Sequence, residues 1–177
     1  LIAMAQALID NKEKIILANA CDMQQAEQNK MRSSMLDRLK LTDVRIEQMA
    51  MGLRQVAALA DPIGNIVGGK TLPNGLQITK VREPLGVIGI IYEARPNVTA
   101  DAVGLCLKSG NAVILKGGSE ALKSNKIIAE ILATAAEKAG LPKDIIQFIA
   151  VSDRQAVTEM IHLNGLIDVV IPRGGAG

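Results

Sequence analysis

The sequence predicts an α/β fold in which a parallel, doubly wound, Rossmann-like sheet is preceded by N-terminal helices and a β-hairpin arm. From residue 83 onwards, short apolar runs alternate with helical stretches, which is the pattern of right-handed βαβ crossovers. The first sixty residues have helical spacing instead, and a stretch rich in Gly, Pro and Asn separates the two regions. The 177 residues suffice for one compact domain or one and a half.

The N-terminal helices are predicted from their apolar faces and their caps. The first face is formed by Leu1, Met4, Leu8, Ile15 and Ile16. Ser33 or Ser34 can cap a short helix, and Thr42 can cap the next one. That next helix has a predicted buried stripe made of Ile46, Met49, Leu53, Val56 and Ala60. Asp61-Pro62 ends it, because proline disfavours helix at the residue before it.

Residues 64–75 predict turns and a linker. Within them, Pro73-Asn74-Gly75 lies between two leucines and predicts a hairpin, since Asn-Gly supplies two positions with positive φ. Residues 77–82 form the expected returning strand.

The remaining chain predicts four buried strands and three helices. The strands are residues 86–91, 112–115, 145–151 and 167–171, and the helices between them are residues 98–109, 123–139 and 153–163. Glycines follow the helices as stop signals, at Gly110, Gly140 and Gly165. Four buried strands joined by three helices imply a parallel sheet.

The composition excludes several classes of function. One Tyr, one Phe and no Trp leave few rings on which bases could stack, which argues against binding of single-stranded nucleic acid. A net charge of +2 is too small to attract a polyanion, so any anion site must be local. The chain has no apolar run long enough for a membrane span, and its N-terminus lacks the features of a signal peptide.

The cysteines and the histidine predict neither a metal site nor a nucleophile. Two Cys and one His cannot form a zinc site of standard spacing. Cys106 lies between leucines and is expected in the core, while Cys21 has no partner base. His162 closes a helix. Reduced thiols are expected.

The two ends of the sequence favour a fragment. The first residue is Leu within a helical pattern, and residues 171–177 stop inside a glycine turn. We expect the chain to be incomplete at both ends.

Three loops follow the predicted strands, and ligands of open parallel sheets bind beyond the carboxyl ends of strands. The loops are residues 92–99, 116–120 and 172–177, and each carries a cation with Gly or a small polar residue. Together they could receive a phosphorylated ligand.

The middle loop favours a nucleotide. Lys116 offers a charge for a phosphate, and Gly117 and Gly118 let a ligand approach the backbone. Ser119 can cap the following helix, and Glu120 offers acceptors for ribose hydroxyls. The alternative is a tight turn with a solvated lysine.

The last loop offers backbone N–H groups and an arginine at the start of a helix, which suits a pyrophosphate. Its candidate residues are Arg173, Gly174, Gly175 and Gly177. A plain glycine turn is the alternative. No G-x-G-x-x-G follows the first strand, so any dinucleotide binds in another mode.

The first loop is the one expected to face a reaction. Asn97 could donate to a developing oxyanion, or could be only a helix N-cap. Arg95 could pair with a phosphate or a carboxylate, or could be an ordinary surface residue.

The sequence resembles the γ-glutamyl phosphate reductase family, within the aldehyde dehydrogenase superfamily. The resemblance rests on residues 81–89, on Glu-Ala-Arg-Pro-Asn at 93–97 and on residues 108–118, and it extends to residues 35–39, 59–62 and 171–177. It covers essentially the whole chain. It implies an aldehyde dehydrogenase-type fold with three parts: residues 1–63 as a helical segment, 64–82 as an oligomerisation arm and 83–177 as an NADPH-binding domain.

The resemblance also implies a reaction and partners. The family reduces L-glutamyl 5-phosphate with NADPH to L-glutamate 5-semialdehyde and releases phosphate, a cytoplasmic step of proline biosynthesis. A cysteine thiolate displaces the phosphate, and hydride from the nicotinamide reduces the thioester. A homo-oligomer is expected, with no nucleic acid, membrane or metal.

By position, the resemblance assigns roles to the candidate residues. Lys116 would contact the adenosine ribose or its 2′-phosphate, and Glu120 would lie at the ribose. The 173–177 segment would lie by the cofactor phosphates. Asn97 would correspond to the oxyanion asparagine.

One departure limits the resemblance. In the family the catalytic cysteine lies in a second domain, C-terminal to the residues seen here, and neither Cys21 nor Cys106 occupies that motif. We expect these residues alone to bind NADPH at most weakly and not to catalyse. The alternatives are another acyl-reducing aldehyde dehydrogenase and a non-catalytic oligomerisation module.

Overall fold

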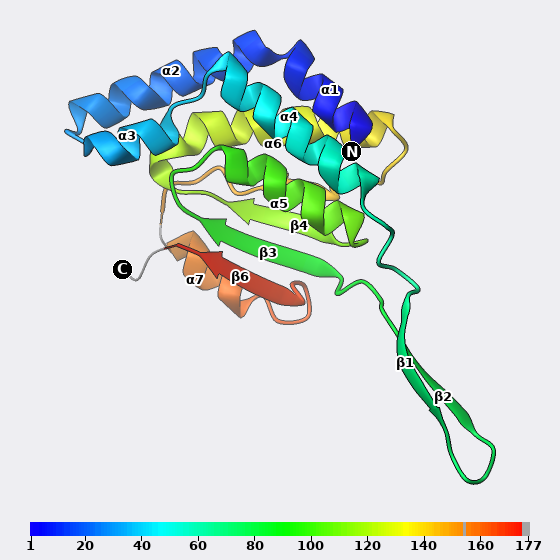
Figure 1. Cartoon of the computed structure of the whole chain (residues 1–177). Helices are drawn as coiled ribbons and strands as arrows, with labels where there is room; N and C mark the ends of the chain where they lie inside the picture. Colours follow the sequence, from blue (N-terminus) through cyan, green and yellow to red (C-terminus); the bar gives the residue numbers. More distant parts are fainter. Residues whose placement is uncertain (154, 175–177) are drawn as a thin grey trace.

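The computed structural model describes residues 1–153 and 155–174 (Figure 1). Four helices form its N-terminal part: α1 (Ile2–Asp10), α2 (Lys12–Gln28), α3 (Ser33–Leu39) and α4 (Asp43–Ala58). A two-stranded hairpin follows, made of β1 (Ile66–Thr71) and β2 (Gln77–Val81). The rest of the chain alternates strands and helices: β3 (Val87–Tyr92), α5 (Asn97–Lys108), β4 (Ala112–Lys116), η1 (Ser119–Ala121), α6 (Leu122–Lys138), β5 (Ile146–Phe148), α7 (Gln155–His162) and β6 (Val169–Arg173).

The four strands β3 to β6 form one parallel sheet in the order β5-β4-β3-β6. The chain moves from β3 through β4 to β5 and then returns to place β6 on the other side of β3. Helices α5 and α6 cover one face of the sheet and α7 lies on the other (Figure 1). This arrangement confirms the predicted doubly wound α/β fold, and the order reverses between β3 and β6. The prediction of four buried strands is only partly right, because β5 is much shorter than the predicted strand 145–151 and β6 is half-buried to exposed.

The N-terminal helices share a core with the sheet. Helices α1 and α4 lie over α5 and α6 (Figure 1), and one continuous apolar cluster joins Met4 and Leu8 of α1 to Leu53 of α4, Val103 of α5 and Leu132 of α6. Burial of this aliphatic surface is the main stabilising contribution, at about 25 cal/mol per Å² of apolar area removed from water. The helical layer therefore helps to form the domain that carries the sheet.

The structure confirms most of the predicted pattern in α4. The Oγ1 atom of Thr42 accepts a hydrogen bond from the backbone N–H of Arg45 at 3.3 Å, as expected of an N-cap. The stripe is buried at Ile46, Met49 and Leu53, whereas Val56 is half-buried and Ala60 is exposed beyond the helix end.

The predicted cap of α3 is wrong. Ser33 is the first helical residue, the N-cap is Arg32, and no side chain accepts a capping hydrogen bond there.

The hairpin is confirmed, but its first strand, β1, lies within residues 64–75, so the prediction of turns and a linker there is wrong. Its turn also differs from the prediction. The backbone N–H of Gly75 donates to the carbonyl of Leu72 at 2.9 Å, and that of Leu72 donates to the carbonyl of Leu76 at 2.8 Å. Gly75 has a φ of 85°, and Asn74 is not in the positive-φ region. Proline at 73 favours a type I turn, in which only the glycine that follows needs positive φ.

Helix α6 is capped from a distant part of the chain, and the predicted cap by Ser119 is wrong. Ser119 opens the short η1 turn and caps no helix. Instead, the buried carboxylate of Asp22 in α2 accepts hydrogen bonds from the backbone N–H and the hydroxyl of Ser124, both at 2.7 Å. It also accepts from the backbone N–H of Lys123 at 3.3 Å. Asp22 therefore satisfies the first turn of α6 and joins α2 to it.

Candidate functional site

The three predicted loops lie at one edge of the sheet. They follow β3, β4 and β6, which are adjacent and parallel, so their carboxyl ends meet at that edge. The strand register pairs Ile91 with Lys116 and Tyr92 with Arg173. The loops after β3 and β6 flank the point where the strand order reverses, which is the usual ligand position in such sheets.

A cavity of about 330 Å³ lies at this reversal point, and we call it the switch cavity. It is lined by Glu93, Arg95, Arg173 and Gly174. A Cβ atom at position 174 would lie 3.1 Å from Oε1 of Glu93, so glycine leaves this wall open. Two guanidinium groups in one cavity suit a phosphate or a carboxylate. Gly175 and Gly177, which belong to the same predicted cradle, lie outside the described residues.

Lys116 is not a solvated lysine. Lys116 is only 4% exposed, and its ammonium group donates a hydrogen bond to the carbonyl of Gly117 at 3.0 Å. Burial lowers the pKa of Lys116, while the negative charges of Glu120 and Asp153 act in the opposite direction. An ammonium group has three donors, so Lys116 retains capacity for a ligand next to Glu120.

Packing constrains the two glycines after Lys116 to different degrees. A Cβ atom on Gly117 would collide with the side-chain amide of the buried Asn125. On Gly118 it would lie 2.7 Å from Oε2 of Glu120, the end of a flexible side chain, and 3.3 Å from the backbone nitrogen of Ala94. Protein atoms therefore explain glycine at position 117, whereas at position 118 the contacts are tight but Glu120 can move.

A buried polar chain lies beneath this turn, and the sequence analysis missed it. Thr99 donates to Oδ1 of Asn125 at 3.2 Å and is 2.7 Å from the hydroxyl of Tyr92. Burial raises the pKa of Tyr92. The Nδ2 atom of Asn125 has no hydrogen-bond partner among the described residues. The one sequence signal for this buried amide is the position of Asn125 on the inward face of the predicted helix.

Asn97 is not the N-cap of α5. Pro96 takes that position, and Asn97 is the first helical residue, with its side chain exposed. Its Nδ2 atom donates to Asp101 over a long 3.4 Å. Burial raises the pKa of Asp101, opposed by the positive charge of Arg173 and by the hydrogen bond from Asn97. Because the side chain of Asn97 is exposed and its one hydrogen bond is long, its amide is accessible to a ligand.

The cysteines have the environments that the sequence predicts. Cys106 is buried, burial raises its pKa to about 11, and both Cys106 and Cys21 are free thiols. Nδ1 of His162 bonds the carbonyl of Thr158 at 2.6 Å, within its own helix. Across residues 1–153 and 155–174 no three His, Cys, Asp or Glu side chains form a group that could hold a metal ion. Over the same ranges, every helix is too short or too polar to cross a bilayer.

A second cavity, which sequence reasoning missed, also has a volume of about 330 Å³. It lies between the segment that joins α3 to α4 and the start of α5, and we call it the helix cavity. Arg95, Asn97 and Asp101 line one side. Arg38, Lys40 and Arg45 line the other, from a region sixty residues earlier in the chain. The sequence pattern around these three cations is that of an ordinary solvated surface. Only the packing of α4 on α5 places them at the helix cavity.

Comparisons with known proteins agree with this architecture. A model of the aldehyde dehydrogenase family matches residues 3–174. A protein from Caldanaerobacter subterraneus named gamma-glutamyl phosphate reductase is 58% identical over 175 residues, which are 99% of this chain and 42% of that protein.

Solved structures of two proteins with that name are also similar. The structure from Thermotoga maritima has a TM-score of 0.95 at 41% identity, covering 99% of this chain and 42% of its own. The structure from Saccharomyces cerevisiae has a TM-score of 0.87 at 33% identity, covering 98% and 44%. The chain thus spans less than half the length of these relatives.

Proposed function

The chain belongs to the aldehyde dehydrogenase family, and we propose that it is the cofactor-binding part of an NADPH-dependent reductase of L-glutamyl 5-phosphate. The products would be L-glutamate 5-semialdehyde and phosphate, in proline biosynthesis. The names of the relatives support this substrate. The observation that carries the proposal is the meeting of Lys116, Arg95 and Arg173 at the carboxyl edge of the sheet, where the strand order reverses.

The residues at this edge fit a dinucleotide with an additional phosphate. Lys116 has free donors beside the Glu120 carboxylate, so the pair can hold the adenosine ribose and its 2′-phosphate. Arg173 offers a guanidinium, and Gly174 a backbone without a side chain, for the pyrophosphate, next to the side chain of Glu93. Bound NADPH would supply a hydride.

The start of α5 would act on the substrate. The exposed amide of Asn97 can donate to the carbonyl oxygen as negative charge develops on it. Arg95 can pair with the phosphate that leaves. In this proposal neither Cys106 nor Cys21 is the nucleophile, because Cys106 is a buried thiol and Cys21 lies in α2, outside both cavities. The thiolate would come from the remaining length that the relatives possess.

The hairpin supports a further part of the proposal. All residues of its two strands are exposed, and a lone two-stranded hairpin is marginally stable in water. We assign it to contacts between copies of the chain. Residues 1–63, 64–82 and 83–177 would then be the helical segment, the arm and the cofactor-binding domain.

A chimera tests the reaction. These 177 residues replace the matching segment of the Caldanaerobacter subterraneus relative, and phosphate release from glutamyl phosphate is followed with NADPH. We expect activity from the chimera and none from the 177 residues alone. Turnover by the 177 residues alone would contradict the assignment of the nucleophile. A chimera that is inactive on glutamyl phosphate but reduces another acyl phosphate would favour a different acyl-reducing enzyme.

A further inference from the structure

We propose that the helix cavity binds the amino-acid end of the substrate, with Arg38 and Lys40 as the residues that select it. This inference rests on the function proposed above. It concerns the amino-acid end of glutamyl phosphate, which the residues of the switch cavity would not contact. It starts from a volume of about 330 Å³ next to Asn97, walled by cations from a separate layer of the fold.

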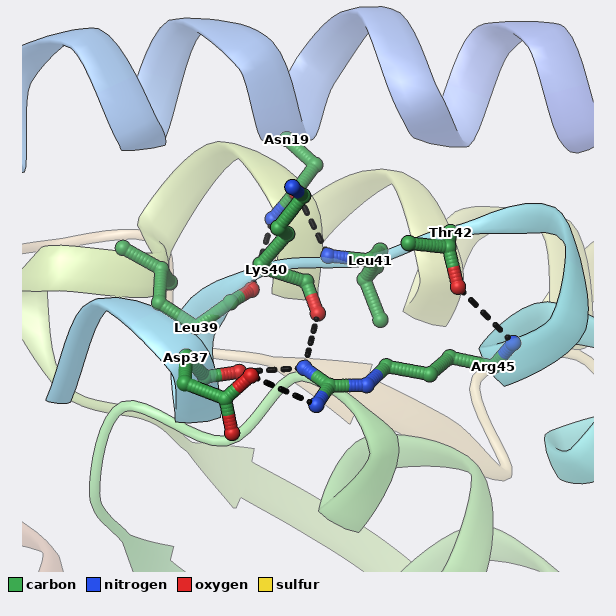
Figure 2. Close-up of polar contacts among 7 residues, drawn as sticks. All are labelled: Asn19, Asp37, Leu39, Lys40, Leu41, Thr42 and Arg45. Atoms are coloured by element: carbon green, nitrogen blue, oxygen red, sulfur yellow. Dashed lines mark hydrogen bonds and ion pairs between the residues drawn. The ribbon is translucent and has the colours of Figure 1, made fainter. Parts of the chain in front are cut away.

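The wall that carries Arg38 and Lys40 is fixed in place. Asn19 of α2, which is 3% exposed, donates to the carbonyl of Leu39 at 2.9 Å and accepts from the N–H of Leu41 at 2.7 Å. Figure 2 shows that Lys40 lies between these two anchored residues. A binding wall that is already ordered loses less entropy when a ligand arrives.

Arg45 completes this wall from the other side. Its guanidinium donates to the carbonyl of Lys40 at 2.7 Å, to the carboxylate of Asp37 at 2.9 Å and to the carbonyl of Asp37 (Figure 2). Arg45 and Asp37 therefore form an ion pair with each other, and their role is to position the segment that joins α3 to α4. They do not decide the net charge that a ligand meets.

The cations that remain are available. Among the described residues, no ion pair engages Arg38, Lys40 or Arg95. Arginine offers a planar fork that matches a carboxylate, and lysine adds a point charge. The helix cavity thus presents three free positive charges, enough to hold a carboxylate that is partly removed from water.

The same cavity contains an acceptor for an ammonium group. The carboxylate of Asp101 lines it, and the only hydrogen bond that Asp101 accepts from a described side chain is the long one from Asn97. An α-amino acid carries a carboxylate and an ammonium on one carbon, so a site for it needs both signs of charge close together. Arg38, Lys40 and Asp101 line the same cavity and meet this requirement.

One short ligand can extend from the helix cavity to Arg95, beside the place proposed for the cofactor pyrophosphate at Arg173 and Gly174. Arg95 lines the helix cavity and the switch cavity, and Asn97 lies at the wall of the former. A glutamyl phosphate whose carbonyl lies at Asn97 would direct its phosphate to one side of Arg95 and its amino-acid end to the other. The distinction between this substrate and a simple acyl phosphate would then be made by Arg38 and Lys40.

The test uses the full-length chimera in the reverse direction, with NADP⁺ and phosphate. Three five-carbon aldehydes are compared: glutamate 5-semialdehyde, 5-oxopentanoate, which lacks the amino group, and pentanal, which carries no charge. Arg38→Gln and Lys40→Gln are measured against Arg32→Gln, an exposed cation at the N-terminus of α3 that does not line the helix cavity. Asp101→Asn is measured as the ammonium-side variant, and NADP⁺ affinity is recorded for every variant.

We expect Arg38→Gln and Lys40→Gln to raise KM for both carboxylate-bearing aldehydes by roughly tenfold, with pentanal unchanged. Asp101→Asn should raise KM only for the aldehyde with an amino group, and Arg32→Gln should change nothing. An equal effect on pentanal, or no effect on the semialdehyde, would overturn the inference. A parent chimera that oxidises pentanal but not the semialdehyde would instead refute the proposed function, before any variant is considered.

Discussion

Two sets of polar side chains in this chain behave in opposite ways. Asn19, Asp22 and Ser124 are buried and bonded to one another or to the backbone, and they join α2 to α6 and to the α3–α4 segment. Arg38, Arg95 and Arg173 are exposed or half-buried, line cavities and form no ion pair with any described residue. Buried polar groups are costly unless bonded, so the first set maintains the architecture, whereas the second set remains available to a ligand.

The largest expected effect separates these roles by stability. Asp22→Ala removes three hydrogen bonds from the first turn of α6 and should lower the free energy of unfolding by about 3 kcal/mol. Glu27→Ala, an exposed acid on the same helix, should change it by less than about 0.5 kcal/mol. Urea unfolding followed by circular dichroism measures both. Equal losses would mean that the cap contributes little.

The next effect concerns the turn after β4. Gly117→Ala should cost about 2 kcal/mol, because the added Cβ displaces the buried Asn125 and the polar chain attached to it. Gly68→Ala is the control, since position 68 has open space around it and no positive φ. The same unfolding experiment applies. A Gly117 variant as stable as the control would remove the packing explanation for this glycine.

A smaller effect, visible in binding and not in stability, is expected at the cavity cations. Arg173→Gln should weaken NADPH binding by roughly tenfold and leave the free energy of unfolding within about 0.5 kcal/mol. Lys143→Gln lies on the exposed loop that precedes β5, at the amino ends of the parallel strands. It should alter neither NADPH affinity nor the free energy of unfolding. Nicotinamide fluorescence gives the affinities. Unchanged affinity in Arg173→Gln would place the cofactor phosphates elsewhere.

The smallest effect is a pH dependence at Lys116. Its pKa in the folded chain is lowered by burial from the usual 10.5, so the folded state releases this proton before the unfolded state does. Lys116 therefore opposes folding while it is charged, and stability should rise as pH increases through the lowered pKa towards 10.5. Lys116→Met should show a flatter stability curve between the lowered pKa and 10.5. A steeper curve in the variant would contradict the sign.

Sequence patterns predicted the sheet better than the polar contacts. Strands β3 and β4 are short apolar runs rich in β-branched residues, so both could be located from the sequence. The loops at the carboxyl edge followed from the parallel order of those strands. The capping of α6 by Asp22 could not be predicted, because the two are a hundred residues apart and local spacing pointed to Ser119. The helix cavity was missed for the same reason.

Titration of the 177 residues with NADPH, followed by nicotinamide fluorescence, tests the central claim most directly. We expect weak but saturable binding that is weaker still with NADH, because Lys116 lies where a 2′-phosphate would be held. We expect a further loss of affinity in Arg173→Gln. A stably folded chain that binds no NADPH at millimolar concentration would contradict the proposed cofactor site and would favour a non-catalytic assembly module.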